Sequence, residues 1–259
     1  MNKPTPPSKL SFPSWDDSPL AHRIQLASEP EPDSERAPRP KILRMLGELT
    51  WFAEPILRLF RRFDIVESAR PAIVLILPGF ATHPGKMHYM AKQIERAGHK
   101  TKRWGLGWNW GARKNLLDEL EERLASVCER YDAKVVVLGW SLGGLYAREL
   151  AKRRPECIDK VITMGSPFSG SPRANNVWRI YQFVTGHRVD KPPVEANMAT
   201  KPPVETVAMW SINDGAIHPR SAAGYPSERD RAVALRCTHM GFSYSKEAIH
   251  AVLEELERD

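Results

Sequence analysis

The sequence predicts an α/β fold, with a mostly parallel central sheet of about six strands flanked by helices. From Arg70 onward, short β-branched runs alternate with helical stretches, a pattern typical of parallel sheets built with right-handed crossovers. The run from Val135 to Leu138 is apolar at every position, which indicates a central strand buried on both faces. The chain has 259 residues, 42% hydrophobic and 27% charged. It is therefore long enough for one folded domain with an appendage.

The order of the expected elements follows from these runs. Strands are expected at 72–77, 99–104, 134–139, 158–165, 205–211 and 231–237. Helices with apolar residues at helical spacing are expected near 86–97, 113–130, 142–154 and 245–257. The segment 166–204 interrupts the alternation and contains one short helical candidate, NNVWRIYQFVTG. Because long insertions in compact domains are often functional, we expect 166–204 to form a lid over the active site.

We expect the folded domain to span 64–259. The part of the chain before this domain divides into two segments. Nine of the 22 prolines lie within residues 1–40. Such a segment buries little apolar surface, so we expect a flexible tail. Residues 41–63 carry apolar residues at helical spacing, interspersed with arginines, which predicts an amphipathic helix. Three alternatives stay open for this helix: it lies on a membrane surface, packs on its own domain, or packs on a second subunit.

Composition excludes several classes of protein. The net charge of +7 is spread along the chain and no nucleic-acid-binding motif accompanies it, so we expect no nucleic-acid partner. Cys128, Cys157 and Cys237 are odd in number and lack CxxC spacing, as expected for reduced thiols. We expect no secretory signal, because no apolar stretch follows Lys3 and Lys9, and no stretch approaches the ~20 apolar residues that span a bilayer. These features predict a cytoplasmic protein.

The most specific motif is Gly139-Trp140-Ser141-Leu142-Gly143, which matches G-x-S-x-G. A strand is expected before it and a helix after it, and in that setting the motif places its serine on a sharp, strained turn. The flanking glycines are needed because side chains there would collide with the neighbouring strand and helix. Ser141 is therefore the candidate nucleophile. The alternative is a structural serine at a helix N-cap.

A serine nucleophile needs a base and an acid that orients the base. His239 follows the last expected strand, so it opens onto the same edge of the sheet as Ser141; His218, after the preceding strand, is its rival. Asp214 follows the strand at 205–211, and the order Ser, Asp, His is the one expected for this arrangement. The alternative for Asp214 is a residue that caps its own loop.

The remaining site predictions rest on position. Backbone N–H groups of Leu142, after the nucleophile, and Phe80, after the first core strand, are expected to bind the oxyanion. Trp108 and Trp110 lie after the second strand and Trp140 lies in the motif itself. Their indoles would line an apolar acyl pocket or, equally, serve in packing.

With these residues in place, the chain resembles the α/β-hydrolase superfamily, and its lipase- and esterase-like members in particular. The resemblance covers about residues 70–257 and rests on PGF at 78–80, GWSLGG at 139–144, VITMGSPF at 161–168, SINDG at 211–215 and CTH at 237–239. It implies hydrolysis of a small-molecule or lipid ester without metal or organic cofactor. No HGGG loop is present, which argues against the esterase branch that uses one.

Other readings share this arrangement of residues. An acyltransferase would use the same triad with an alcohol or thiol in place of water. Hydroxynitrile lyases and cofactor-free perhydrolases also share it. A non-catalytic binding or scaffold protein would keep the fold and use 41–63 for docking. The acyl and alcohol groups and the oligomeric state do not follow from the sequence.

Overall fold

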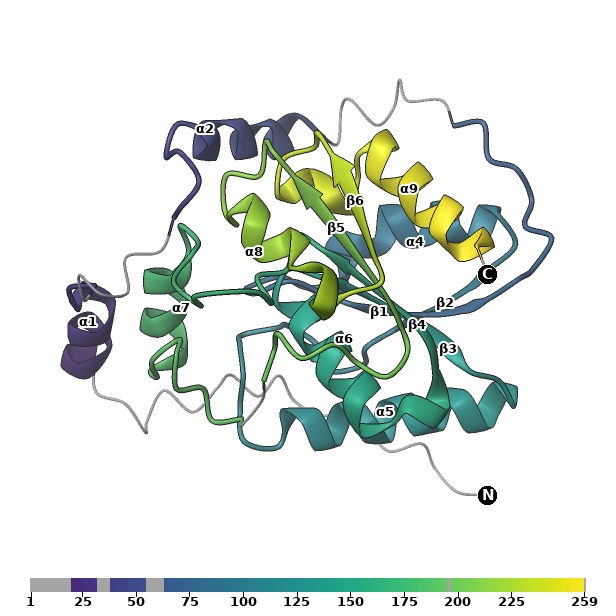
Figure 1. Cartoon of the computed structure of the whole chain (residues 1–259), viewed down its shortest axis with the longest axis horizontal. Helices are drawn as coiled ribbons and strands as arrows, with labels where there is room; N and C mark the ends of the chain where they lie inside the picture. The colour runs from purple at the N-terminus through teal and green to yellow at the C-terminus, as the bar shows by residue number, and fades with distance from the viewer. Residues whose placement is uncertain (1–19, 32–37, 55–62, 195–196, 259) are drawn as a thin grey trace, which may run out of the picture.

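The computed structural model of the chain describes residues 20–31, 38–54, 63–194 and 197–258. Within these residues lies a six-stranded sheet in the order β2-β1-β3-β4-β5-β6, which runs through the middle of Figure 1. All five neighbouring pairs are parallel. The strands are β1 (Ile73–Leu77), β2 (Lys100–Arg103), β3 (Val135–Trp140), β4 (Ile158–Met164), β5 (Glu205–Ser211) and β6 (Arg231–Leu235). The predicted α/β fold is confirmed.

Helices cover both faces of the sheet. In Figure 1, α4 and α9 lie above it, and α5 and α6 lie below it. Their bounds are α4 (His88–Arg96), α5 (Leu116–Tyr131), α6 (Leu142–Arg153) and α9 (Lys246–Glu257). Each follows a rule visible in the sequence: on α5, for example, Leu117, Leu120, Leu124 and Val127 recur at helical spacing and are buried.

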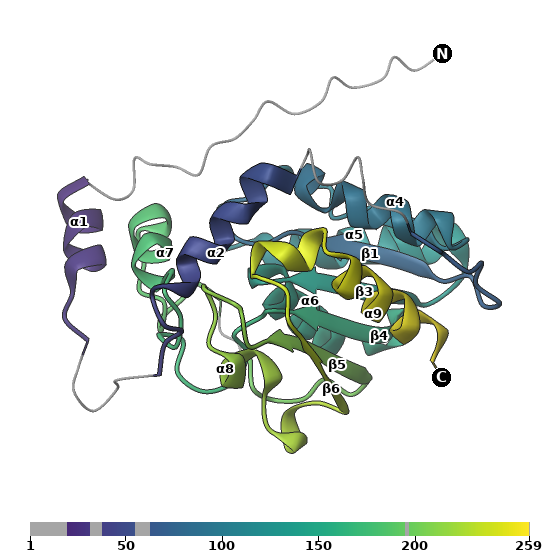
Figure 2. The ribbon, with the colours of Figure 1, turned by 90° about the horizontal axis from the view of Figure 1, so that it is seen from above.

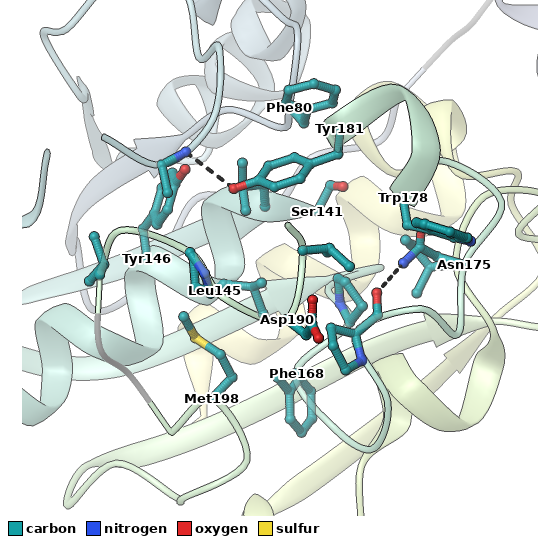
Figure 3. Close-up of a pocket in the computed structure, with 18 of the residues that line it drawn as sticks. Phe80, Ser141, Leu145, Tyr146, Phe168, Asn175, Trp178, Tyr181, Asp190 and Met198 are labelled. Carbon is teal, nitrogen blue, oxygen red and sulfur yellow. Dashed lines mark hydrogen bonds between the residues drawn. The ribbon is translucent and has the colours of Figure 1, made fainter. Parts of the chain in front are cut away.

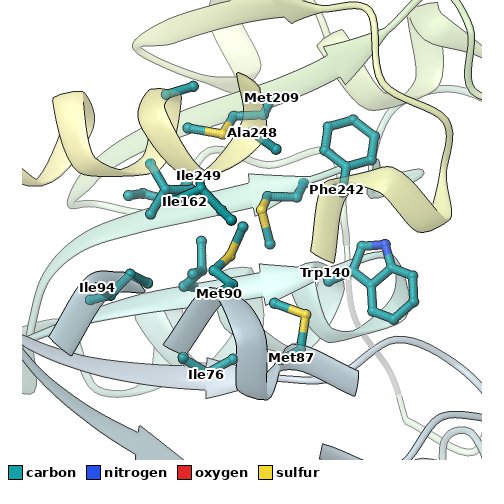
Figure 4. Packing of buried hydrophobic residues seen from close by; sticks show 14 of the residues in the cluster. Ile76, Met87, Met90, Ile94, Trp140, Ile162, Met209, Phe242, Ala248 and Ile249 are labelled. Atoms are coloured by element: carbon teal, nitrogen blue, oxygen red, sulfur yellow. The ribbon is translucent and has the colours of Figure 1, made fainter. Parts of the chain in front are cut away.

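Two hydrophobic clusters fill the spaces between the sheet and these helices. On one face, Met90 and Ile94 of α4 and Ile249 of α9 pack against strand residues such as Ile162 (Figure 4). On the other face, α5 and α6 pack on the opposite side chains of β1, β3 and β4. Since β3 is buried at all six positions, the predicted central strand is the one that leads into Ser141.

Shorter helical segments complete the described part of the chain. They are α1 (Leu20–Ser28), α2 (Arg44–Glu48), η3 (Leu49–Ala53), η5 (Pro84–Met87), η6 (Pro155–Cys157), α7 (Trp178–Thr185), α8 (Pro219–Ala223), η7 (Pro226–Glu228) and η8 (Met240–Ser243). Among the residues that the structure describes, every helix is too short or too polar to traverse a bilayer.

The segment predicted as a flexible tail, 1–40, contains a helix, so this prediction needs correction over Leu20–Ser28. Helix α1 lies beside α7 in both Figure 1 and Figure 2. Arg23 donates hydrogen bonds to the carbonyls of Phe183 and Val184 at the end of α7, and Leu26 is buried. Tertiary contacts thus stabilise a helix that its proline-rich surroundings disfavour. Residues 1–19 and 32–37 lie outside the described residues.

The helix predicted over 41–63 is described only in part. Its described part consists of α2 followed directly by the 3₁₀ helix η3, and residues 55–62 lie outside the described residues. We refer to residues 41–53 as the N-terminal strap. The strap runs beside the ends of β5 and β6 (Figure 1), so it packs on its own domain, one of the three alternatives raised by the sequence.

Candidate active site

The candidate site lies where the strand order changes direction. The chain passes from β1 outward to β2 and then returns to place β3 on the other side of β1. In parallel sheets, ligands bind in the crevice outside the carboxyl ends of strands at such a switch point. Phe80 follows the end of β1, and Ser141 follows the end of β3 directly. Topology alone therefore brings these two predicted residues together.

Ser141 occupies the strained turn that the motif predicts. Its backbone has φ 54° and ψ −122°, in a region that residues other than glycine rarely adopt. The flanking glycines allow β3, α6 and the end of β1 to pack closely. A Cβ on Gly139 would collide with the Gly144 backbone of α6, and one on Gly143 with the carbonyl of Leu77. Because backbone cannot move aside as a flexible side chain does, this close packing holds Ser141 at the N-terminus of α6.

The two predicted oxyanion donors flank the serine. A Cβ on Gly79 would lie 3.2 Å from the Ser141 Cβ, so the turn after β1 runs against the nucleophile. Phe80 and Leu142 line the same cavity as Ser141. Within the described residues, neither backbone amide donates a hydrogen bond to protein. Both N–H groups therefore remain available to a developing negative charge.

Asn109 supports this turn and was not found by sequence reasoning. Its side chain donates to the Pro78 carbonyl at 2.8 Å, and its own carbonyl accepts from the Ala81 amide at 2.6 Å. Asn109 is 1% exposed. It lies in a loop between two predicted elements, where asparagine is common, so the sequence carried no signal for this role.

Asp214 and His239 form a buried hydrogen-bonded pair. The Nδ1 of His239 lies 2.8 Å from Oδ2 of Asp214, and the other carboxylate oxygen accepts from the amides of Ala216 and Ile217 at 2.8 and 2.7 Å. With Asp214 holding Nδ1–H, the Nε2 of the neutral ring is left as a proton acceptor. The backbone bonds fix the carboxylate orientation, so the acid is held as an orienting group requires.

The loop that carries His239 is tied to the strand that leads into Ser141. The indole Nε1 of Trp140 donates to the His239 carbonyl at 3.1 Å, so the residue before Ser141 holds the loop that carries the imidazole. Burial alone would lower the pKa of His239, but the carboxylate of Asp214, with a smaller contribution from Glu48, raises it above its ordinary 6.5. The rival, His218, caps α8 by accepting from the Arg220 amide and makes no such pair with Asp214 among the described contacts.

Ser141 opens onto an apolar cavity of about 430 Å³. Figure 3 shows Phe80, Tyr181 and Trp178 around the serine, with Met198 further along the wall. Most of the lining comes from 166–204, the predicted lid, which covers the cavity from β4 to β5. The phenol of Tyr181 accepts from the Ala112 amide at 3.4 Å, so helix α7 is connected to the loop before α5.

Two carboxylates also line this cavity, and both are ion-paired. Asp190 lies 3.3 Å from a guanidinium nitrogen of the buried Arg173 and 3.1 Å from Arg188. Glu149 lies 2.5 Å from the ammonium of Lys152. Burial, the largest single influence, would raise the pKa of Asp190, but its hydrogen bonds and the nearby charges of Arg173 and Arg188 together outweigh burial and lower it. The cavity thus offers apolar surface with internally neutralised charges.

The three tryptophans predicted to line the pocket lie elsewhere. Trp140 is 1% exposed and belongs to the core between the sheet, α4 and α9. Trp108 and Trp110 stack on each other with ring centroids 5.2 Å apart, and Trp108 is 41% exposed. None of them is among the residues that line the described cavity. The wall predicted from these indoles is built instead by the insertion.

Fold and site together define an α/β-hydrolase, with a strand–serine–helix turn and an acid–histidine pair at the carboxyl edge. Comparison with protein families agrees, because the family described as Serine aminopeptidase, S33 matches residues 68–211. The chain belongs to this family. The match ends before Asp214 and His239, so it does not bear on these two residues.

Individual relatives show how far the similarity extends. A pimeloyl-[acyl-carrier protein] methyl ester esterase from Nitrosospira multiformis is 28% identical over 114 residues, which cover 40% of this chain and 42% of that protein. Less than half of that relative is therefore matched.

Solved structures share the fold. The hydrolase MGS-MChE2, from a metagenome of lagoon sediments at Mar Chica, Morocco, has a TM-score of 0.53 at 19% identity, covering 76% of this chain and 95% of that one. A monoacylglycerol lipase from Paleococcus ferrophilus has a TM-score of 0.50 at 16% identity, covering 74% and 96%.

Proposed function

We propose that the protein hydrolyses carboxylic esters of uncharged, apolar acyl groups through an acyl-enzyme on Ser141. The single observation that carries this proposal is the strained Ser141 at the mouth of an apolar cavity, beside a loop that holds the Asp214–His239 pair. The partial match to a methyl ester esterase supports the same class of reaction.

The reaction follows from these positions. Ser141 Oγ attacks the ester carbonyl while its proton passes to Nε2 of His239, and the carbonyl oxygen takes the negative charge beside the amides of Phe80 and Leu142. The carbon–alkoxide bond then breaks, and His239 returns the proton to the departing alcohol. Water repeats the sequence: it loses a proton to His239, adds to the acyl carbon, and displaces Ser141 to release the acid.

The nature of the cavity supports the proposed substrate class. An apolar acyl chain gains stabilisation from each methylene removed from water, about 0.8 kcal/mol per group. A volume of about 430 Å³ is at the small end of the range for ligand pockets, roughly 300–1,000 Å³. Charged acyl groups are disfavoured because the lining is mainly apolar and the charged groups Asp190 and Glu149 are already paired with their own cations.

The family description raises a second reading, hydrolysis of the amino-terminal residue of a peptide. That activity needs a carboxylate able to bind the substrate's α-ammonium group. Asp190 is the closest match by chemistry, but Arg173 and Arg188 already contact it. We therefore favour esters. Acyl transfer to an alcohol or thiol remains the alternative outcome of the same acyl-enzyme, and a non-catalytic scaffold is the alternative to both.

A substrate panel tests these readings together. The purified chain is assayed with p-nitrophenyl esters of increasing acyl length, amino-acid p-nitroanilides, and an ester with added acceptor alcohol. The expected result is ester hydrolysis that rises with chain length until the cavity is filled, and that disappears in Ser141→Ala. Preference for the anilides would favour the peptidase, transfer products would favour the acyltransferase, and inertness toward every substrate would contradict the proposal.

We also propose that the N-terminal strap contacts an anionic lipid surface. Five apolar side chains of the strap are more than half exposed: Ile42, Leu43, Leu46, Leu49 and Phe52. Exposed apolar side chains gathered on one segment are typical of interaction surfaces. Lys41 and Arg44 lie on the same segment of a chain with net charge +7, which complements the phosphates of anionic lipids.

A further inference from the structure

One carboxylate outside the proposed triad contacts both the loop that carries Asp214 and the loop that carries His239. Glu48, the last residue of α2, accepts a hydrogen bond from the backbone amide of His239 at 2.8 Å through Oε1. The same oxygen accepts from the Gly215 amide at 3.0 Å, and Oε2 accepts from the Met240 amide at 2.8 Å. One side chain therefore bridges the residue after Asp214 and the histidine itself.

The strap fits closely enough to make this bridge specific. Gly215 has no side chain, and a Cβ there would lie 2.6 Å from the Arg44 carbonyl oxygen and 2.8 Å from the Met45 amide nitrogen. Gly47, one residue before Glu48, lies near the histidine loop, and a Cβ there would be in ordinary contact with the Thr238 methyl group at 3.6 Å. Backbone of the strap thus rests directly on the acid loop and beside the histidine loop (Figures 1 and 2).

Position along the chain makes the contact unusual. Glu48 lies 191 residues before its partner amide at His239 and 167 before that at Gly215. It also precedes residues 68–211, the part of the chain that matches the family. The carboxylate therefore comes from a segment before the matched range, yet it contacts the loops that carry Asp214 and His239.

We propose that Glu48 is a positioning residue that fixes the Asp214–His239 pair from the N-terminal strap; this inference rests on the proposed function. Hydrogen bonds from backbone amides to a carboxylate are charge-assisted and directional. Because three of them converge on one side chain, the two loops cannot separate without breaking at least one. The negative charge also adds to that of Asp214 in favouring the imidazolium form of His239, the form that arises as Ser141 attacks.

The simpler explanation is that Glu48 only attaches the strap. The two explanations differ in what Glu48→Gln would change. Glutamine keeps the volume of the side chain but replaces one acceptor oxygen by an NH₂ donor, which would face an amide donor. An attachment role predicts a lower melting temperature with an unchanged site. A positioning role predicts a lower kcat, a shifted pH profile and a changed His239 proton signal in a protein that remains folded at the assay temperature.

The test compares Glu48→Gln and Glu48→Asp with the full-length wild type. For Glu48→Gln we expect kcat to fall about 10- to 100-fold with little change in KM, and the acid limb of the pH profile to move to lower pH. Glu48→Asp keeps the charge and should recover part of the rate. Glu129→Gln, the same change of charge at an exposed position of α5, should match the wild type in all respects.

A second readout does not depend on turnover. The His239 Nδ1 proton held by Asp214 should give a low-field NMR signal in the wild type. That signal should be lost or broadened in Glu48→Gln and kept in Glu129→Gln. If the wild type is inactive, the proposed function fails, while the signal still decides the role of Glu48. An unchanged signal and pH profile in a folded Glu48→Gln protein would overturn the inference.

Discussion

At the scale of single residues, the site depends on how a buried carboxylate and a buried imidazole share charge. Asp214 is 1% exposed and His239 is 7% exposed, so burial alone would favour an uncharged ring. The 2.8 Å contact with Asp214 reverses that preference and raises the pKa of His239. If His239 is the base that we propose, this raised pKa lets it accept the serine proton more readily than an ordinary histidine would.

This shift predicts the pH dependence of the reaction. Catalysis needs neutral His239, and a raised pKa means that the ring stays protonated to higher pH. The value of kcat/KM should therefore fall as pH decreases through a point above 6.5, the ordinary value. The measurement is kcat/KM for an uncharged ester across pH. Asp214→Asn should move this limb to lower pH and reduce kcat by about 10⁴-fold, whereas a wild-type limb below 6.5 would contradict the account.

Sequence reasoning found part of this site and missed the rest for a physical reason. Ser141, Asp214 and His239 were predicted because each follows a β-branched run, and the carboxyl ends of parallel strands meet at one edge. Glu48 and Asn109 act on backbone groups, which leave no side-chain pattern in the sequence. The indoles at 108 and 110 were placed at the pocket or in packing from their position after the second strand, and position along the chain does not distinguish a pocket wall from a stacked surface pair.

At the scale of elements, the insertion that covers the cavity is held by a buried arginine. Arg148 on α6 is fully buried, and its guanidinium donates to the carbonyls of Met198, Ala199 and Thr200 and to that of Glu228. Burial lowers the pKa of Arg148 to about 10, so it stays charged at neutral pH. The nucleophile helix thus holds the far end of the insertion in place.

We predict that Arg148→Met destabilises the protein by about 3 kcal/mol, because several buried carbonyls lose their donor. The same change should raise KM, since Met198 and Ala199 line the cavity. Urea denaturation and steady-state kinetics measure the two effects. The control is Arg153→Lys on the same helix, whose partly exposed ion pairs are worth only about 0.5 kcal/mol. Equal stability of Arg148→Met and the wild type would refute this role.

The strap gives a second prediction at this scale. The wild type should co-sediment with vesicles of phosphatidylglycerol and phosphatidylcholine in equal parts, and less with phosphatidylcholine alone. Replacing Leu43 and Leu46 together by serine should weaken binding at least about tenfold, because two apolar side chains no longer enter the lipid. Val66→Ser, at an 86% exposed position outside the strap, serves as the control. Equal sedimentation of the double variant and the wild type would remove the proposed lipid contact.

Elements were predicted best where local pattern and tertiary packing agree. The run at 134–139 becomes β3 with every residue buried, and the helix expected near 245–257 begins where Ser245 caps it by accepting from the Ala248 amide. The pattern failed at α1, which is helical because Arg23 and Leu26 contact α7. Such contacts join distant parts of the chain, so a local window does not contain them.

At the scale of the whole molecule, the sheet brings together residues that lie far apart in the sequence. The strand order creates the switch point beside β1 and β3, and β5 and β6 deliver the acid and the base to the same edge. Two further segments contact this frame: the segment between β4 and β5 lines most of the cavity, and the strap holds the loops after β5 and β6 through Glu48. In the proposed function, substrate selection and orientation of the triad would thus come from different segments.

Covalent labelling of the intact chain with a fluorophosphonate, followed by mass spectrometry of its peptides, tests most directly whether Ser141 is a nucleophile activated by His239. We expect one equivalent of label on Ser141, no label in Ser141→Ala, and labelling slowed at least about 10³-fold in His239→Gln, because the hydroxyl loses its base. An unlabelled wild type, or labelling of Ser141→Ala at the wild-type rate, would contradict this role of Ser141.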